Sequence, residues 1–336
     1  MKKILSVLLI LVLCFSLAAC GQKTENKPSE SQNEKVEKLD TKCNIFAING
    51  PTGLGLVSLM DKAENKEGNL DYTISTVGTN DAIVAKVVNK EADIAAVATN
   101  QASALYKATN GGITVLAVNT LGVLNIVAKG EEISSVKDLA GKTVYTTGQG
   151  ANPEYISKFV LEQNGLKVGD NVNLEFVSQP QELVTKVVSS EKAIVIAPQP
   201  IATLITVKDS NAKIVININD EWNKFSETEL VMGCIIARKE WAEKNPQAVK
   251  IFLKDYEKSI LAVSNDIDNV ATLSEKYGII SPAAVVKKAA PYCNIVFQTG
   301  KNMKTNLSAY LKFMFDNNPK SVGGELPAKD FYYEAN

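Results

Sequence analysis

Histidine is absent from this chain of 336 residues, and arginine occurs once, at Arg238. Without histidine, the chain has no Ser-His-Asp or Cys-His catalytic site and no histidine-ligated metal site. The five cysteines form no CxxC pair, so the sequence gives no support for a zinc or iron–sulfur centre. The 36 basic residues are balanced by 37 acidic ones, which argues against a nucleic-acid partner. We therefore expect neither a metal nor another cofactor.

The scarcity of arginine also limits how the protein can hold an anion. A bidentate grip on a carboxylate or phosphate is characteristic of the guanidinium group. With Arg238 as the only such group, an anionic ligand would have to be held by backbone N–H groups, hydroxyls, amides or lysine.

The N-terminus has the pattern of an export signal. Two lysines precede an apolar run over residues 4–15, which is too short for a permanent membrane-spanning helix. The following Leu-Ala-Ala-Cys resembles the bacterial lipobox, so we expect a signal peptide over 1–19 and lipidation of Cys20. A plain signal peptide with an incidental cysteine is the alternative. Only two apolar residues occur in 22–42, which predicts that 20–42 is a disordered tether behind the lipidated cysteine.

The folded part contains two similar stretches of sequence. Residues 77–105 align without a gap with 177–205, and eight positions are identical, including Val84/Val184, Lys86/Lys186 and Glu91/Glu191. Each stretch has a helix with apolar residues on one face, such as Ile83, Val84, Val87 and Val88, followed by a short apolar strand. Two similar βαβ units would also arise without any relation between them. On either account the pattern predicts two α/β lobes.

Glycine-rich loops open both halves. A strand over 44–48 is followed by Gly-Pro-Thr-Gly and a helix to about residue 63, and a strand over 143–147 is followed by a helix from Pro153 to Gln163. Neither loop fits the dinucleotide or phosphate-loop fingerprint. Apolar strands over 124–128 and 231–237 flank the second half, and the last hundred residues are mostly helical, with Asn245 as an expected helix cap. We predict an α/β fold with two lobes, in which each lobe is a mostly parallel sheet flanked by helices and two strands form the hinge. Lobe 1 comprises 43–123 and 232–336, and lobe 2 comprises 124–231.

Ligands of open α/β sheets sit at the carboxyl ends of the strands, where helix N-termini point N–H groups outward. Two lobes that face each other in this way would provide polar groups on both walls of a cleft. The candidate ligand-binding residues are Asn49, Pro51, Thr52, Gly53, Thr79, Asn80, Thr99, Asn100, Thr120, Thr147, Gln149, Asn152, Gln199 and Glu229.

Each candidate has a purely structural alternative. Asn80 is suited to cap a helix, and Gly53 to serve turn geometry or a close approach to a ligand. Trp222, Phe225 and Tyr145 could stack on a flat ligand, although aromatic residues near strand ends more often pack in the core. Glu229 and Glu154 lie near the expected cleft, but their spacing identifies no acid–base pair for catalysis.

With these features in place, the chain resembles the solute-binding lipoproteins of ATP-binding-cassette (ABC) importers, within the nitrate/sulfonate/thiamine-precursor group that has the type II periplasmic-binding fold. The stretches DLAGKTV (138–144), APQP (197–200) and NPQAVKIFL (245–253) carry the resemblance, which covers about 43–320. Ala193 stands where the family usually has an aspartate, and relatives often carry an acid at the position of Gln199. The second lobe is therefore less acidic than in relatives.

The resemblance implies an extracytoplasmic protein, lipid-anchored on the outer face of the bacterial membrane, that is a monomer and not an enzyme. Its partners would be a small-molecule ligand and an ABC permease with its ATPase, and the ligand would shift an open–closed equilibrium. A heterocyclic vitamin precursor and a sulfonate-like anion both remain open, with the neutral or weakly charged heterocycle slightly favoured. A hydrolase or transferase that reuses the fold, and a ligand-sensing lipoprotein, are the alternative functions.

Overall fold

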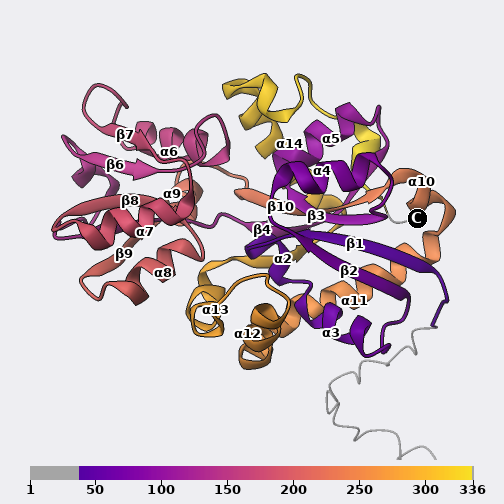
Figure 1. Ribbon diagram of the computed structural model, residues 1–336. Coiled ribbons are helices and arrows are strands. Elements are labelled where there is room, and N and C mark those ends of the chain that lie inside the picture. The colour runs from indigo at the N-terminus through magenta and orange to yellow at the C-terminus, as the bar shows by residue number, and fades with distance from the viewer. Residues whose placement is uncertain (1–37, 335–336) are drawn as a thin grey trace, which may run out of the picture. The chain divides into compact units, whose positions relative to one another are not determined.

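The computed structural model describes residues 38–334 and contains two β-sheets, each flanked by helices (Figure 1). The first sheet has six strands in the order β11-β4-β10-β3-β1-β2, and the second has five in the order β7-β6-β8-β5-β9. The predicted two-sheet α/β fold is confirmed. The expected signal peptide, Cys20 and most of the tether lie outside the described residues. The last residues of the expected tether are attached to the body, because Leu39 N donates to Asn69 O and β1 begins at Lys42.

Four strands of the first sheet run in the same direction. β1, β2 and β3 pair in parallel, and β10 lies antiparallel between β3 and β4, so that β4 points the same way as β1. β11 is the edge strand, antiparallel to β4. The bounds are β1 Lys42–Ile48, β2 Asp71–Val77, β3 Ile94–Ala98, β4 Ile113–Leu121, β10 Val231–Arg238 and β11 Ile295–Gln298.

Helices cover both faces of the first sheet (Figure 1). On one side lie α4 (Asn80–Val88), α5 (Thr99–Ala108) and the long α14 (Gly300–Asn317). The expected helix to residue 63 is split into α2 (Pro51–Leu54) and α3 (Val57–Glu64). These two lie on the other side with α11 (Pro246–Asn265) and α12 (Ile267–Lys276). The remaining helices associated with this sheet are α10 (Lys239–Lys244) and α13 (Ala283–Ala289), with short 3₁₀ turns at Ala290–Tyr292, Pro319–Val322 and Lys329–Phe331.

The second sheet repeats the plan. β6, β7, β8 and β9 share one direction and β5 runs against them. The alternation of side chains along β5 divides the core, with Ile126 in the cluster that includes α6, and Val127 in the cluster that includes α7 and α8. The bounds are β5 Leu124–Lys129, β6 Thr143–Thr146, β7 Asn173–Phe176, β8 Ala193–Pro198, β9 Ala212–Asn217, α6 Asn152–Gln163, α7 Pro180–Ser189, α8 Ile201–Lys208 and α9 Ile218–Asn223, with a 3₁₀ turn at Val136–Leu139.

Two local predictions are corrected by the structure, and one strand was not predicted. Val88, expected on the apolar face of its helix, is 49% exposed, whereas Ile83 and Val87 are buried. Asn245 stands at the N-cap of α11, but its side chain donates backwards to Trp241 O and does not cap the helix. The sequence analysis also did not anticipate β11, whose four residues carry too little periodicity to be recognised.

Candidate functional site

The strand directions bring the candidate loops of the first sheet to a single edge. Strands β1 to β4 all end there, so the residues that follow Ile48, Val77, Ala98 and Leu121 lie at this edge. The antiparallel strand β10 begins there, directly after Glu229 and Leu230. In the second sheet the same reasoning collects the loops that follow β6, β7, β8 and β9, together with the start of β5. We call these the first and second polar edges.

Two connections join the polar edges to each other. Gly122 and Val123 link the end of β4 to the start of β5, and residues 218–230 link the end of β9 to the start of β10. Both connections thus leave one polar edge and enter the other. Asn294 fixes the first connection, because its Nδ2 donates to Gly122 O and its carbonyl oxygen accepts from Leu121 N at 3.0 Å. A Cβ on Gly122 would lie 2.7 Å from Asn219 Oδ1, so this glycine permits a close approach between the two connections.

Polar side chains converge on Gly233 at the first polar edge. The position that its Cβ would occupy lies 2.7 Å from Asn119 Oδ1, 2.8 Å from Thr52 Oγ1 and 2.9 Å from Thr120 Oγ1. Asn119 is held in place because its Nδ2 donates to Thr52 O at 2.8 Å and to Tyr256 OH at 2.9 Å. The structure therefore brings together two predicted residues, Thr52 and Thr120, with Asn119, which the sequence analysis missed.

Several other candidates at the first polar edge have structural partners. Thr99 is buried and donates through Oγ1 to Val231 O at 2.9 Å, and Asn100 Nδ2 donates to Ser321 O at 3.4 Å. Asn49 is exposed and Pro51 is half-buried. Gly53 serves internal packing, since a Cβ there would lie 2.6 Å from Ile48 O.

The predicted helix cap at Asn80 is wrong by one residue. Thr79 is the N-cap of α4, and its Oγ1 accepts from Ala82 N at 3.3 Å. Asn80 is the first residue of the helix. The backbone of Thr79 is extended, as an N-cap requires, and its hydroxyl therefore reaches the third backbone N–H of the helix.

The second polar edge holds four further candidates. Thr147, Asn152 and Gln199 are buried, and Gln149 is exposed. Asn152 begins α6, and its Oδ1 has no hydrogen-bond partner among the described residues. Gln199 Oε1 accepts from Thr203 Oγ1 at 2.8 Å, while its Nε2 has no partner in the same part of the chain.

Two asparagines at this edge were missed. Asn125 lies one residue into β5, and Asn219 lies at the start of α9. Each has a buried Oδ1 without a partner among residues 38–334. Asn125 stands inside an otherwise apolar strand, LGVLNIVAK, where a buried polar residue is the signal that could have indicated it, whereas Asn219 follows directly after the apolar strand β9 and has only its place after a strand end as a signal.

Both carboxylates considered for the site, and the aromatic residue Trp222, have partners within the protein. Glu229 Oε2 accepts from Gln298 Nε2 at 2.5 Å and from Asn306 Nδ2 at 2.6 Å. Glu154 belongs to the other sheet; burial raises its pKa, but the Gly150 N–H and Lys158 outweigh this and the net pKa is lowered. Trp222 is 2% exposed and packs against rings of α6 and α14, so it is a core residue and no stacking platform.

The other two aromatic candidates differ from Trp222. Tyr145 is half-buried and lies beneath the Lys186 ammonium group, 4.1 Å from the ring centroid. Phe225 is exposed. Neither has a contact that points to a bound ring.

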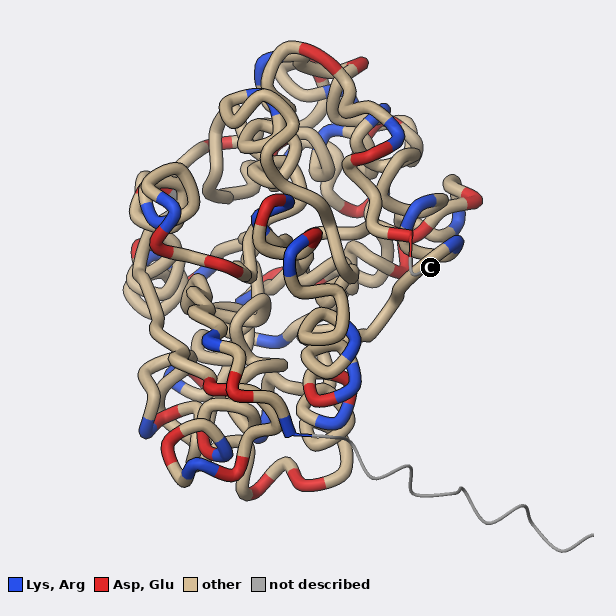
Figure 2. The backbone as a smooth tube through the Cα atoms, turned by 90° about the vertical axis from the view of Figure 1, so that its right-hand side faces the viewer, with Lys and Arg blue, Asp and Glu red and all other residues tan. Residues whose placement is uncertain are grey.

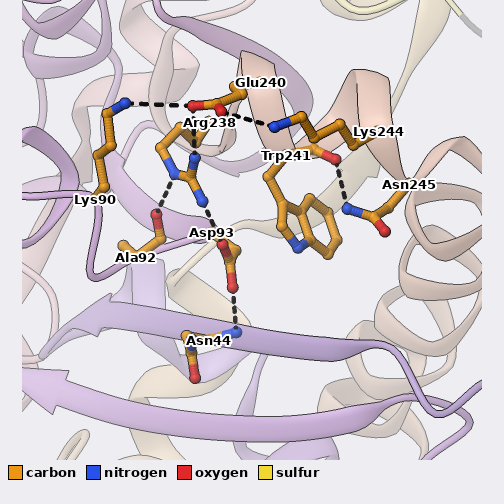
Figure 3. A network of polar contacts seen from close by, with 9 residues as sticks. All are labelled: Asn44, Lys90, Ala92, Asp93, Arg238, Glu240, Trp241, Lys244 and Asn245. Atoms are coloured by element: carbon orange, nitrogen blue, oxygen red, sulfur yellow. Dashed lines mark hydrogen bonds and ion pairs between the residues drawn. The ribbon is translucent and has the colours of Figure 1, made fainter.

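The single arginine lies at the opposite end of the first sheet (Figure 3). Arg238 Nη2 donates to Asp93 Oδ1 at 2.7 Å, and Asp93 Oδ2 accepts from Asn44 N at 2.9 Å. Nη1 of the same guanidinium lies 3.3 Å from Glu240. The guanidinium therefore joins β10 to β3 and β1 and takes no part in the polar edges.

Residues 38–334 offer neither a metal site nor a membrane-spanning helix. Within this range no group of three or more acidic or cysteine side chains is placed to hold a metal ion. The same residues include no helix with the length and apolar character needed to cross a membrane. Cys43, Cys234 and Cys293 are all buried and free.

Comparison with known proteins agrees with this geometry. The family model described as NMT1/THI5-like matches residues 65–269, which is more than half of the chain. The chain belongs to the NMT1/THI5-like family. The matched NMT1/THI5-like region includes the whole second sheet and both connections between the polar edges. No protein with a curated description matches the sequence.

Solved structures show the fold of this NMT1/THI5-like chain. An ABC transporter protein from Parabacteroides distasonis superposes with a TM-score of 0.75 at 20% identity, over 88% of this chain and 100% of its own. The periplasmic aliphatic sulphonate-binding protein SsuA from Escherichia coli gives 0.70 at 13% identity, over 89% and 94%. The periplasmic nitrate-binding protein NrtA from Synechocystis gives 0.59 at 13% identity, over 85% of each chain.

Proposed function

We propose that this protein is the extracytoplasmic solute-binding component of an ABC importer, and that it captures a small organic molecule between its two polar edges. The observation that carries the proposal is the pair of connections at Gly122–Val123 and 218–230, both of which run from one polar edge to the other. A ligand that contacts both edges shifts the equilibrium toward the arrangement in which they approach each other. Family membership and the sulphonate- and nitrate-binding neighbours support this function.

Binding without chemistry fits the side chains at the edges. Glu229 and Glu154 stand on different sheets, and each already has hydrogen-bond partners. The neighbours are likewise described as binding proteins or transporter components. We infer that the chain is not an enzyme, that it acts as a monomer and that it delivers its ligand to a permease.

The proposed division of the chain follows the sheets. Residues 43–123 and 232–336 would form one moving body and 124–231 the other, with Cys20 as the lipid anchor that keeps the protein at the membrane. Substitution of Cys20 by alanine is expected to release the protein from the membrane fraction, whereas a plain signal peptide would leave its distribution unchanged.

The test of the proposed function is the recovery of a bound compound. Native mass spectrometry of protein purified from its own source is expected to show one additional small-molecule mass, and unfolding should release it unchanged. Small-angle scattering before and after ligand removal should show a smaller radius of gyration in the bound form. Turnover of the compound would contradict the proposal, as would identical scattering with and without it.

A further inference from the structure

The loops at the two polar edges carry almost no charge. The residues between each strand end and the next element, at 49–50, 78–79, 122–123, 147–151, 177–179, 199–200 and 224–230, include only Lys224, Glu227 and Glu229 as ionisable residues. Lys224 is paired with Glu221 at 2.6 Å. Figure 2 shows basic and acidic residues interspersed over the described chain. The edges thus lack the free cation with which an anion site usually neutralises its ligand.

Helix N-termini could in principle replace a cation, because their free N–H groups attract anions. At the second polar edge, side-chain oxygens already accept hydrogen bonds from some of the N–H groups at or just before the helix starts. Glu182 and Gln179 form a capping box at α7, and Glu154 accepts from Gly150 N at 2.6 Å before α6. Gln199 Oε1 lies 3.4 Å from Thr203 N in the first turn of α8. Two carboxylates, Glu154 and Glu182, therefore already lie at the starts of α6 and α7, where their negative charge opposes the approach of an anion.

Two lysines of the helices that begin at this edge are also engaged. Lys158 pairs with Glu154, and Lys186 lies over the Tyr145 ring. Arg238 belongs to the network at the far end of the first sheet. An anion that approached the second polar edge would meet acids and neutral dipoles, without a compensating positive charge.

An amide pair remains beside the first connection. The carbonyl oxygen of Val123 accepts from Gln199 N at 2.9 Å and from Asn125 Nδ2 at 3.0 Å, so the two residues are neighbours. The bond from Asn125 Nδ2 fixes the orientation of the Asn125 amide, and the bond from Thr203 Oγ1 to Gln199 Oε1 fixes that of the Gln199 amide. Asn125 Oδ1 then offers an acceptor and Gln199 Nε2 a donor, and neither has a partner among residues 38–334. Asn125 is 1% exposed and Gln199 2%, so the unmet bonds are unfavourable.

We propose that Asn125 and Gln199 determine the ligand class: the protein selects an uncharged polar group that donates a hydrogen bond to Asn125 Oδ1 and accepts one from Gln199 Nε2, and it rejects strong anions. This inference rests on the proposed function of the polar edges. A primary carboxamide, a urea or a lactam has such a donor beside an acceptor. Because Val123 lies in the connection between the sheets, movement about it uncovers the two amides, and their pairing with ligand favours the bound arrangement.

The experiment uses matched probes that differ only in charge. Calorimetric titration of the mature protein compares nicotinamide with nicotinate and acetamide with acetate, and adds methanesulfonate and nitrate. The uncharged member of each pair is expected to bind at least about tenfold more tightly, the effect of one unmet hydrogen bond. Raising the salt concentration should leave the binding of the amide unchanged, since no ion pair forms.

Two variants add the same negative charge to the same edge. Gln199→Glu replaces the free donor and is expected to weaken amide binding at least about tenfold. Gln179→Glu, at an exposed position of this edge, should leave it unchanged. An anionic ligand would be weakened by both variants. Should Gln199→Glu fail to fold, the probe pairs and the salt dependence with the unmodified protein decide the question.

Each outcome is informative. Tighter binding of nicotinate, methanesulfonate or nitrate would overturn the inference and leave the proposed function standing. If none of the probes binds, the net charge of the compound found by native mass spectrometry tests the inference: an uncharged compound supports it, and a negatively charged compound contradicts it. If neither a probe nor a native compound binds, the proposed function fails together with it.

Discussion

Gly233 gives the sharpest test of the first polar edge. Replacing it with alanine places a methyl group within 2.9 Å of Asn119 Oδ1, Thr52 Oγ1 and Thr120 Oγ1. Contacts this short force at least one neighbour to move. Asn119 cannot move freely, because it would lose its bonds to Thr52 O and Tyr256 OH. Overpacking of this kind costs about 1–3 kcal/mol, and we expect about 2 kcal/mol for Gly233→Ala.

The assay is urea unfolding, followed by fluorescence or circular dichroism. Gly78→Ala is the matched control, because Gly78 lies at the same edge, has an ordinary φ and has nothing within 4 Å of its Cβ position. We expect the control to change the free energy of unfolding by less than about 0.5 kcal/mol. Equal unfolding midpoints for the two variants would refute the close convergence of polar groups on Gly233. Ligand binding should also weaken in Gly233→Ala and persist in Gly78→Ala.

Three further predictions concern the body of the protein. Asp93→Ala leaves the Arg238 guanidinium without its main partner, so it should lower the free energy of unfolding by about 3 kcal/mol in a urea titration. Glu240→Gln is the control, because Glu240 is exposed, and it should leave the unfolding midpoint nearly unchanged. Three hydrogen bonds from Ser134 and Ser135 hold the pKa of Asp138 at about 2, below its ordinary value of 3.8. Its contribution to stability is therefore present above pH 3.8 and lost as the pH falls through 2, so Asp138→Asn should show a smaller loss of stability on acidification over this range. Burial raises the pKa of Cys293 to about 12, so iodoacetamide should label this thiol only in the unfolded protein, and rapid labelling of the native state would contradict its placement.

The repeated halves were predictable because their signals are local. Apolar periodicity, proline at helix starts and glycine after strands each act within a few residues, and they located β3, β8, α4, α6 and α7. Weaker local signals failed. The cap at α4 shifted from Asn80 to Thr79, because two adjacent polar residues are both suited to cap a helix. The strand β11 was not recognised, because its four residues carry too little periodicity.

The sequence by itself determined the α/β class, the presence of two similar βαβ units, the absence of histidine and the scarcity of arginine, since composition and short-range periodicity are properties of the chain. Only the tertiary structure decided which polar groups meet. Strand direction and order placed Thr52, Asn119 and Thr120 around Gly233, and Asn125 beside Gln199, although long stretches of sequence separate them. Tertiary packing also removed Trp222 from the candidate site, because a buried ring is fixed by contacts with distant elements, and it placed the only guanidinium, Arg238, in an ion pair at the other end of the first sheet.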